Sequence, residues 1–279
     1  MPGYRAIRRK AASLINGVLI ATVGAKVVPA KSKSFAVRRL AKTGGRTRMR
    51  VSLGSRSAEV TLREGTSDWM TFDQIFLDED YDLRPLARHA ELKQIYSGLV
   101  AAGRRPLILD LGANIGLSAV YFHLLWPEAR IVAVEPDPDN AGLLRQNVEG
   151  LDVVVVEGAV AGKPGRVRIA DPRVEKNAVR VAAAEGDAPG EVEAFAVADL
   201  LKRAGEDAAP FIAKIDIEGG ERDLFSGDTG WVDDFPLLSV ELHDWLYPRE
   251  GTAQPFLRAM ADRDRDFVYL DENVFSIRN

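Results

Sequence analysis

The segment that most constrains the fold of this chain is residues 106–136, PLILDLGANIGLSAVYFHLLWPEARIVAVEP. It begins with an apolar run broken only by Asp110, which is typical of a strand buried on both faces of a parallel sheet. From Gly116 the apolar residues recur at helical spacing, and a second apolar strand, residues 131–134, ends in Glu135. This pattern predicts a βαβ unit, and ligands of such sheets bind at the carboxyl ends of the strands.

The turn between the first strand and the helix departs from a dinucleotide fingerprint. That fingerprint, G-x-G-x-x-G, lets the backbone approach a pyrophosphate, and its middle glycine is missing here. The run reads Gly112, Ala113, Asn114, Ile115 and Gly116. Asp110 would repel a phosphate and attract an ammonium group, and Glu135, 19 residues after the last glycine, lies about where an acid reaches ribose hydroxyls. S-adenosylmethionine, which has a ribose, an ammonium group and no phosphate, fits both acids, and a nucleotide-dependent oxidoreductase does not.

Four further blocks follow DLGANIG in the order EPDPDN, EGAV, KIDIEGGE and VELH. Together they resemble the FkbM-type family of S-adenosylmethionine-dependent O-methyltransferases, from roughly Thr66 to the C-terminus. The resemblance implies an α/β fold, a Rossmann-like seven-stranded class I methyltransferase sheet with flanking helices that ends in an antiparallel hairpin. It implies cofactor contacts at Asp110, Gly112, Ala113, Asn114, Gly116, Glu135, Ala159 and Asp216. In the family a segment like residues 76–81 lies beside the cofactor, so Tyr81 is a further candidate.

The composition is that of a globular protein, with 46% apolar and 28% charged residues among 279. The absence of cysteine excludes disulfides and thiolate metal sites, and three histidines are too few for a histidine-rich metal site. Residues 1–50 hold 13 of the 37 basic residues and none of the 41 acidic ones. We therefore expect a basic N-terminal extension and linker over residues 1–50 and a methyltransferase domain over 51–279, whose cofactor-binding core covers about 104–279.

Residues 5–30 begin with basic residues and continue as an apolar stretch that is too short to span a membrane. The stretch resembles a secretory signal, but S-adenosylmethionine is a cytoplasmic metabolite, so we expect a cytoplasmic protein. Two alternatives stay open: a helix on an anionic membrane surface, or a helix packed on the body or on a second copy in a homo-oligomer. Phe35 is the only aromatic residue of segment 31–50, which argues for a linker and against nucleic-acid binding.

Several other segments have recognisable patterns. Residues 163–195 are predicted to be strands or loops inserted over the carboxyl edge of the sheet, a suitable place for acceptor specificity. Other expected elements are a hairpin over 50–62, helices over 66–81, 83–102, 199–205 and 252–265, a buried strand over 152–160, and a closing hairpin over 267–277.

Charged residues gather at the ends of two later predicted strands. In strand 211–220, the side chains of Lys214, Asp216 and Glu218 alternate with apolar ones, and such charges on a central strand are costly unless they bind or pair with something. In strand 237–243 the same alternation brings Glu241 and His243 to the carboxyl end. Both ends are expected to meet above the sheet, although the lysine and its acids could also form a purely structural anchor.

Methyl transfer to a hydroxyl is an in-line displacement that needs positioning and a group to take the hydroxyl proton. We expect His243 to be that base, with Asp216 as its competitor at the methyl end of the cofactor. Glu218, Glu221 and Glu241 are expected to orient these groups. By family analogy the acceptor is a hydroxyl of a saccharide, glycolipid or natural product.

Two alternatives concern the chemistry itself. A metal-assisted site would use Asp216, Glu218, Glu241, His243 and Asp244 as ligands, but we expect a metal-free site. A non-catalytic S-adenosylmethionine-binding protein of the same fold is the alternative to an enzyme.

Overall fold

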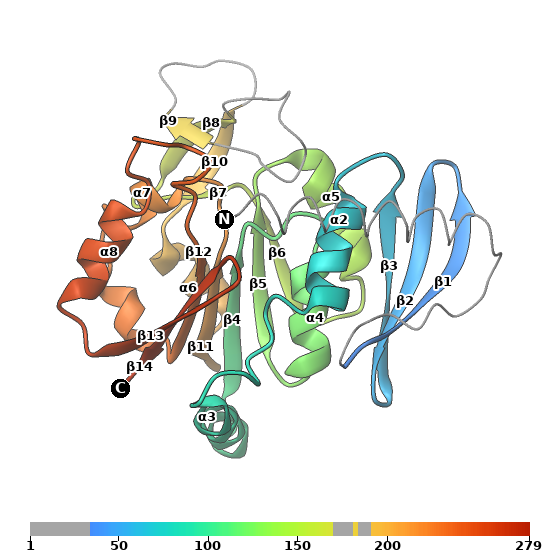
Figure 1. Cartoon of the computed structure of the whole chain (residues 1–279), viewed down its shortest axis with the longest axis horizontal. Coiled ribbons are helices and arrows are strands. Elements are labelled where there is room, and N and C mark those ends of the chain that lie inside the picture. Colours follow the sequence, from blue (N-terminus) through green and yellow to red (C-terminus); the bar gives the residue numbers. More distant parts are fainter. Residues whose placement is uncertain (1–33, 170–180, 184–190) are drawn as a thin grey trace. The chain divides into compact units, whose positions relative to one another are not determined.

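The computed structural model describes residues 34–169, 181–183 and 191–279 and divides into two compact units after Glu79 (Figure 1). Residues 5–30, for which membrane or subunit contact was expected, lie outside the described residues. Within the described residues, no helix is long and apolar enough to cross a membrane.

The first unit contains a three-stranded antiparallel sheet where the sequence predicted a linker followed by a hairpin. Its strands are β1 (Ala36–Thr43), β2 (Arg46–Leu53) and β3 (Arg56–Arg63). Most of residues 36–50, which the sequence assigned to a linker, therefore lie in strands. Alternation explains the strand, because Thr47, Met49 and Val51 are buried while Arg48 and Arg50 between them are exposed. Helix α2 (Asp68–Asp73) and the π-helical turn η1 (Gln74–Asp78) complete the described part of this unit.

The second unit is built on a seven-stranded sheet, as expected from the family resemblance. In spatial order its strands are β13 (Arg265–Leu270), β14 (Asn273–Arg278), β12 (Leu237–Glu241), β11 (Ala208–Ile215), β4 (Arg105–Leu111), β5 (Arg130–Glu135) and β6 (Val153–Glu157). The five neighbouring strands β12, β11, β4, β5 and β6 are parallel, and β14 and β13 add an antiparallel hairpin at one edge. The central strands therefore all direct their carboxyl ends to one side.

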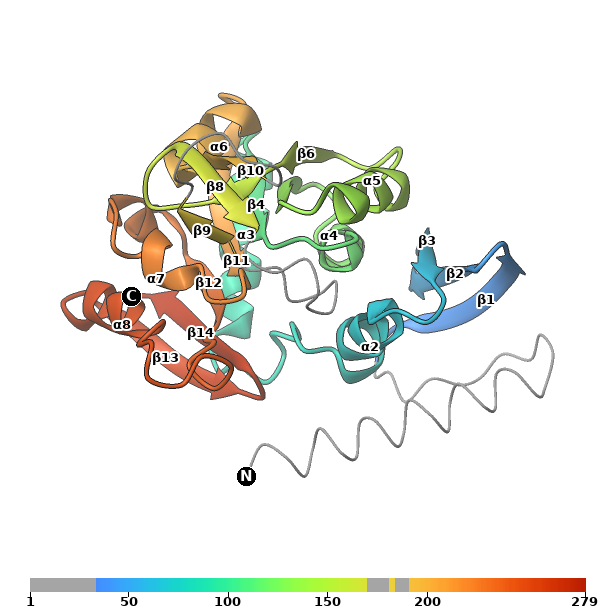
Figure 2. The same cartoon turned by 90° about the horizontal axis from the view of Figure 1, so that it is seen from above.

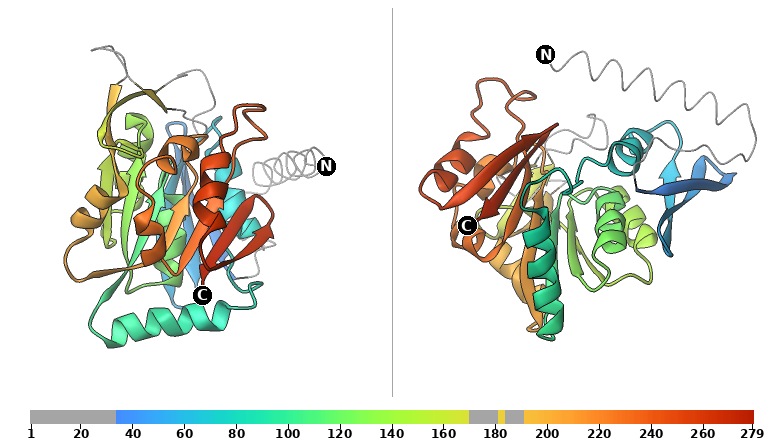
Figure 3. Two further views of the ribbon diagram at one scale, coloured as in Figure 1. Left: turned by 90° about the vertical axis from the view of Figure 1, so that its left-hand side faces the viewer. Right: turned by 60° about the horizontal axis from the view of Figure 1, so that its bottom comes forward.

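Helices cover both faces of this sheet (Figure 2). Helices α4 (Leu117–Leu125) and α5 (Pro138–Asn147) lie on one face, and α6 (Val197–Ala204), α7 (Glu221–Leu224) and α8 (Gln254–Ala261) lie on the other. Helix α3 (His89–Ala101) crosses the amino-terminal ends of β4 and β11 (Figure 3), and the 3₁₀ turn η2 (Gly230–Asp234) precedes β12. Along β4, Leu109 and Leu111 belong to the core cluster that includes Leu200 of α6 and Phe256 of α8. Asp110, between them, faces α4 instead.

The segment after β6 forms a second, four-stranded sheet. Its order is β7 (Ala159–Val160), β10 (Glu191–Phe195), β8 (Gly165–Ile169) and β9 (Val181–Ala183). Figure 1 shows this sheet beyond the end of the large sheet at which β5 and β6 finish. The expectation of inserted strands at that edge agrees with this arrangement, and a role in acceptor specificity stays a prediction.

Two strands end earlier than the sequence predicted. β11 ends at Ile215 and β12 at Glu241, so that Asp216, Glu218 and His243 lie in the loops that follow. In the sequence the alternation of charges continues beyond Ile215. The strand cannot follow it as far as Gly220, because Glu218 has φ +53° and Gly219 has φ +95°, a left-handed turn that no strand accommodates.

Candidate active site

The glycine turn after β4 is packed against the loop after β11. Gly112 has φ +80°, and a Cβ atom there would lie 1.8 Å from the backbone oxygen of Asp216. Gly116 has φ +87° and lies against Leu144 of α5, which a Cβ would approach to 2.5 Å. Only glycine meets both conditions, so this turn can bring the ends of β4 and β11 together.

Glu135, at the end of β5, holds the turn in place. Its carboxylate accepts hydrogen bonds from the backbone N–H groups of Asn114 (2.9 Å) and Asp137 (3.0 Å), and from Nδ2 of Asn140 (3.3 Å). Burial raises the pKa of Glu135 to about 7, although these hydrogen bonds favour the charged form. The side chain is only 5% exposed.

The residues at this edge fit the cofactor that the sequence suggested. The Oδ1 atom of Asn114 is buried and has no hydrogen-bond partner within the described residues, which is costly unless a bound molecule donates to it. Asn114 itself has φ +50°, so the turn holds its side chain in an unusual position. Gly158 donates to the carbonyl of Glu135 (3.0 Å), which brings the neighbouring Ala159 to the same edge. A ligand rich in hydroxyl and amino donors therefore matches the hydrogen-bond acceptors at this edge, the carboxylate of Glu135 and Oδ1 of Asn114.

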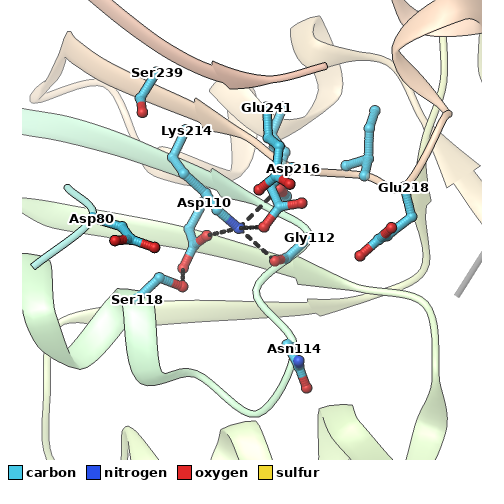
Figure 4. A network of polar contacts seen from close by, with 12 residues as sticks. Asp80, Asp110, Gly112, Asn114, Ser118, Lys214, Asp216, Glu218, Ser239 and Glu241 are labelled. Carbon is cyan, nitrogen blue, oxygen red and sulfur yellow. Dashed lines mark hydrogen bonds and ion pairs between the residues drawn. The ribbon is translucent and has the colours of Figure 1, made fainter. Parts of the chain in front are cut away.

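Lys214 is the centre of a buried polar network between β4 and β11 (Figure 4). It lies directly opposite Asp110 in the sheet register, and its Nζ atom is 3.2 Å from Asp110 Oδ1 and 3.5 Å from Asp216 Oδ2. The same Nζ donates to the carbonyl oxygen of Gly112 at 2.6 Å. Lys214 thus connects the glycine turn with the acid expected at the methyl end of the cofactor.

Asp110 is paired within the protein. It is fully buried, its Oδ1 forms the ion pair with Lys214, and its Oδ2 accepts a hydrogen bond from Ser118 Oγ at 2.6 Å. Oδ1 accepts no hydrogen bond from the described residues. Burial alone would lower the pKa of Lys214, but Asp110 and Asp216 outweigh it, so the pKa is raised and the ammonium keeps its charge. Direct contact between Asp110 and a ligand ammonium stays a prediction.

His243 is the centre of a second group of side chains. It is 1% exposed, and its Nδ1 lies 3.0 Å from Oε1 of the fully buried Glu221. Its Nε2 atom faces three carboxylates, at 3.4 Å from Glu218 Oε2, 3.6 Å from Asp216 Oδ1 and 3.7 Å from Glu241 Oε1. The four residues expected to carry the chemistry are therefore brought together.

The charges of this group are strongly coupled. Burial by itself lowers the pKa of His243, but the hydrogen bond to Glu221 and the nearby carboxylates raise it to about 10. Burial, followed by repulsion from Asp216, raises the pKa values of Glu218 and Glu241. The surrounding acids therefore favour the protonated imidazole, which serves as their counter-ion.

Asp244, which the metal-assisted alternative included, has other partners. Its Oδ1 accepts hydrogen bonds from Thr252 Oγ1 (2.7 Å) and from the backbone N–H of Ala253 (3.1 Å), and so it anchors the loop before α8.

Other polar groups at the site were harder to infer from the sequence. Tyr81, a candidate only by resemblance, is buried, and this burial together with Asp216 and Asp110 raises the pKa of its hydroxyl well above the usual value. Ser118 was missed, because one serine at the start of an apolar helix gives no sign that it faces an acid. Glu221 was expected only as one of several orienting acids, and its pairing with His243, 22 residues later, appears in the folded chain alone.

This chain is similar in sequence to known methyltransferases. The protein-family model for the methyltransferase FkbM domain matches residues 110–269 of this chain. Hexuronic acid methyltransferase AglP of Haloferax volcanii is 24% identical over 178 residues, which cover 61% of this chain and 72% of AglP. The 2-O-methyltransferase NoeI of Sinorhizobium fredii is 40% identical over 63 residues, which cover 22% of this chain and 26% of NoeI.

Solved structures also align with this chain. The structure of precorrin-6y C5,15-methyltransferase from Geobacter metallireducens covers 63% of this chain, and 81% of that structure is covered. Its sequence identity is 14% and its TM-score is 0.36.

Proposed function

The chain belongs to the FkbM methyltransferase family and is an S-adenosylmethionine-dependent methyltransferase, and from this premise we propose that it transfers the methyl group to a hydroxyl oxygen. The observation that carries the proposal is the convergence of Asp216, Glu218, Glu241 and His243 beside the glycine turn. A hydroxyl must lose its proton when it becomes an ether, and this group of side chains can both orient a hydroxyl and accept its proton.

Each residue expected to contact the cofactor is proposed to have a definite role. Bound S-adenosylmethionine supplies an electrophilic methyl group on a positively charged sulfur. Glu135 would accept hydrogen bonds from ribose hydroxyls. Oδ1 of Asn114, which has no hydrogen-bond partner among the described residues, would accept one more from the ligand. Gly112 and Gly116 keep the turn close to the ligand, Ala159 would lie against the adenine, and Asp216 would lie at the methyl end.

Two groups could accept the proton of the hydroxyl. His243 is the base expected from the sequence, and Glu221 directs its Nε2 atom into the cluster. Because its pKa is near 10 without ligands, His243 accepts a proton only when positive charge bound beside Asp216 has lowered that pKa. Glu218 is the second acceptor, 3.4 Å from Nε2.

The acceptor is proposed to be a saccharide or a saccharide-bearing small molecule. The names of AglP and NoeI, a hexuronic acid methyltransferase and a 2-O-methyltransferase, support a sugar hydroxyl. Trp245, in the loop after β12, is 64% exposed and is suited to a sugar ring, whereas Trp231 and Phe235 are buried in the core. A cytoplasmic location, contact with a membrane surface and self-association stay predictions.

The test is an acceptor screen that measures release of S-adenosylhomocysteine from the full-length protein. Uronic acids and neutral sugars with free hydroxyls would be compared with matched amino sugars and with permethylated sugars. We expect turnover only with free hydroxyls, and a new O-methyl signal in the NMR spectrum of the product. Methylation of nitrogen would contradict the proposal.

The alternative of a non-catalytic binding protein is tested separately by calorimetric titration with S-adenosylmethionine and with NADH. Binding of the first without turnover on any acceptor would favour that alternative.

A further inference from the structure

The carboxylates around His243 have the spacing of ligands that share one ion. One ligand atom each from Asp216, Glu241 and His243 lies within 4.8 Å of the others, and Nε2 is 3.6 and 3.7 Å from the two carboxylates. Two ligands bound to one ion at about 2.1 Å lie roughly 3 to 4 Å apart. Figure 4 shows the Asp216 and Glu241 side chains directed toward the same space above Gly112.

The orientation of His243 points independently to a bound cation. The side chain is 1% exposed, Nδ1 is engaged by Glu221, and no hydrogen bond reaches Nε2 within the described part of the chain. Metal-binding histidines commonly donate their other ring N–H to a carboxylate, which fixes the tautomer that binds the metal. The carboxylate of Glu221 is fully buried and also accepts from the backbone N–H of Ile217 (3.2 Å), so it holds the imidazole rigidly.

The local charge balance favours the same conclusion. Five carboxylates gather here, those of Asp110, Asp216, Glu218, Glu221 and Glu241. The lysine of this site, Lys214, pairs with Asp110 and with the far oxygen of Asp216. Among the described residues the ion pairs of Glu218 and Glu241 are with His243 alone. Lys214 and a protonated His243 carry two positive charges against these five partly or fully buried carboxylates, and such an excess of negative charge is costly without a further cation.

We propose that Asp216, Glu241 and Nε2 of His243 bind a divalent cation, Mn²⁺ or Zn²⁺. Two carboxylates and one imidazole suit these ions better than Mg²⁺ or Ca²⁺, which prefer oxygen ligands throughout. Three protein ligands leave positions open for a hydroxyl group, as in catalytic metal sites. Binding of the ion is independent of the proposed function, whereas its role in catalysis rests on that function.

In that role the ion lowers the pKa of an acceptor hydroxyl and holds its oxygen in line with the methyl group. Nε2 is then a ligand, so the hydroxyl proton passes to Glu218. The oxygen–carbon bond forms as the carbon–sulfur bond breaks, and the electron pair of the broken bond leaves on sulfur. The cation thus selects Glu218 over His243 as the proton acceptor.

The experiment is a titration of chelator-treated, full-length protein with Mn²⁺ alone, followed by electron paramagnetic resonance. We expect one Mn²⁺ per chain and nitrogen coupling from an imidazole ligand in the pulsed spectrum of the unmutated protein. Glu241→Gln should weaken binding at least tenfold, and the exposed control Glu149→Gln should leave it unchanged. The nitrogen coupling needs no substitution, so the proposal remains testable if Glu241→Gln does not fold.

Absence of Mn²⁺ binding, absence of nitrogen coupling, or equal affinities in Glu241→Gln and Glu149→Gln would each overturn the proposal. Failure of this inference is distinguishable from failure of the proposed function. Methyl transfer to a hydroxyl that continues in excess chelator would remove the ion from the mechanism and leave the O-methyltransferase intact. Mn²⁺ binding with nitrogen coupling, but without turnover on any hydroxyl, would support the ion site and count against the proposed function.

Discussion

At the scale of single residues, the site depends on a few side chains that each serve two purposes. Glu135 fixes the glycine turn through Asn114 and is also the residue proposed to hold the ribose. Gly112 allows the turn and also the approach of Asp216. Because structure and binding share these residues, their substitution affects both properties and needs controls that separate the two.

Cofactor affinity is expected to depend on the ionisation of Glu135, whose pKa is raised by burial to about 7. Ribose hydroxyls donate to the ionised carboxylate, so binding favours the charged form and lowers this pKa in the complex. Affinity should therefore rise as the pH increases toward 7, by up to about tenfold per pH unit, and level off above it. Calorimetric titration with S-adenosylmethionine from pH 5.5 to 8.5 measures this pH dependence of the affinity. Glu135→Gln should bind weakly with a flat profile, and the same slope in that variant would refute the assignment.

Gly112→Ala is expected to destabilise the protein and to abolish cofactor binding. Its Cβ would overlap the carbonyl oxygen of Asp216, and its φ of +80° is strained for any side chain, so the cost should be at least about 2 kcal/mol. Gly142→Ala in α5 is the matched control, since its Cβ meets no atom within 4 Å and the helix should gain about 0.5 to 1 kcal/mol. Urea denaturation measures the free energy of unfolding of both variants. If Gly112→Ala were as stable as the unmutated protein, the turn could move to accommodate the added Cβ.

At the scale of elements, β4 and β11 are joined by more than their backbone ladder. Lys214 and Asp110 face each other across the two strands, and Lys214 extends to the carbonyl of Gly112 beyond the strand end. A buried pair of this kind contributes little net stability, but removal of one partner leaves the other charged and unpaired. It therefore specifies how the two loops that carry the site are aligned.

Lys214→Met is expected to cost about 3 to 5 kcal/mol, because the carboxylate of Asp110 would be buried without its counter-ion. The double variant Lys214→Met/Asp110→Asn removes that charge and keeps an acceptor for Ser118. It should be more stable than Lys214→Met alone in urea denaturation. The single variant Asp110→Asn completes the double-mutant cycle. If the losses of the two single variants add up to that of the double variant, the two side chains are not coupled.

At the scale of the whole molecule, the described chain has two compact units, each with its own buried residues. Met49, Val51, Val60 and Leu62 are buried in the first unit, and the site residues belong to the second. The unit boundary follows Glu79, whereas the sequence placed a boundary at residue 50.

Damage to the first unit should therefore leave cofactor binding intact. Val51→Asp places a charge at a fully buried position of β2 and should remove amide protection from β1, β2 and β3 in hydrogen exchange. The exposed control Thr43→Asp should keep that protection. Affinity for S-adenosylmethionine should change less than twofold in both variants. Loss of binding in Val51→Asp alone would show that the second unit depends on the first.

Much of the second unit could be predicted from local patterns. The continuous apolar strands, the glycine turn and the acid after β5 are signals within a few residues, so the βαβ unit and its cofactor followed from them. The first unit was partly misread because basic residues alternate with apolar ones in β2, and the charge concealed the period of a strand. Strand ends were also misplaced, since the left-handed backbone at Glu218 interrupts a pattern that the side chains continue.

By itself the sequence determined the class of fold, the family and the set of acids that could take part, because these depend on residue type and short-range spacing. Only the tertiary structure decided how those acids are used. It paired Asp110 with Lys214, engaged His243 Nδ1 with Glu221 and directed Nε2 toward three carboxylates. These partners are separated by up to 104 residues, and their distances, burial and charge coupling exist only after the strands have aligned. The physical reason is that a charge acquires its function from its surroundings, which folding creates.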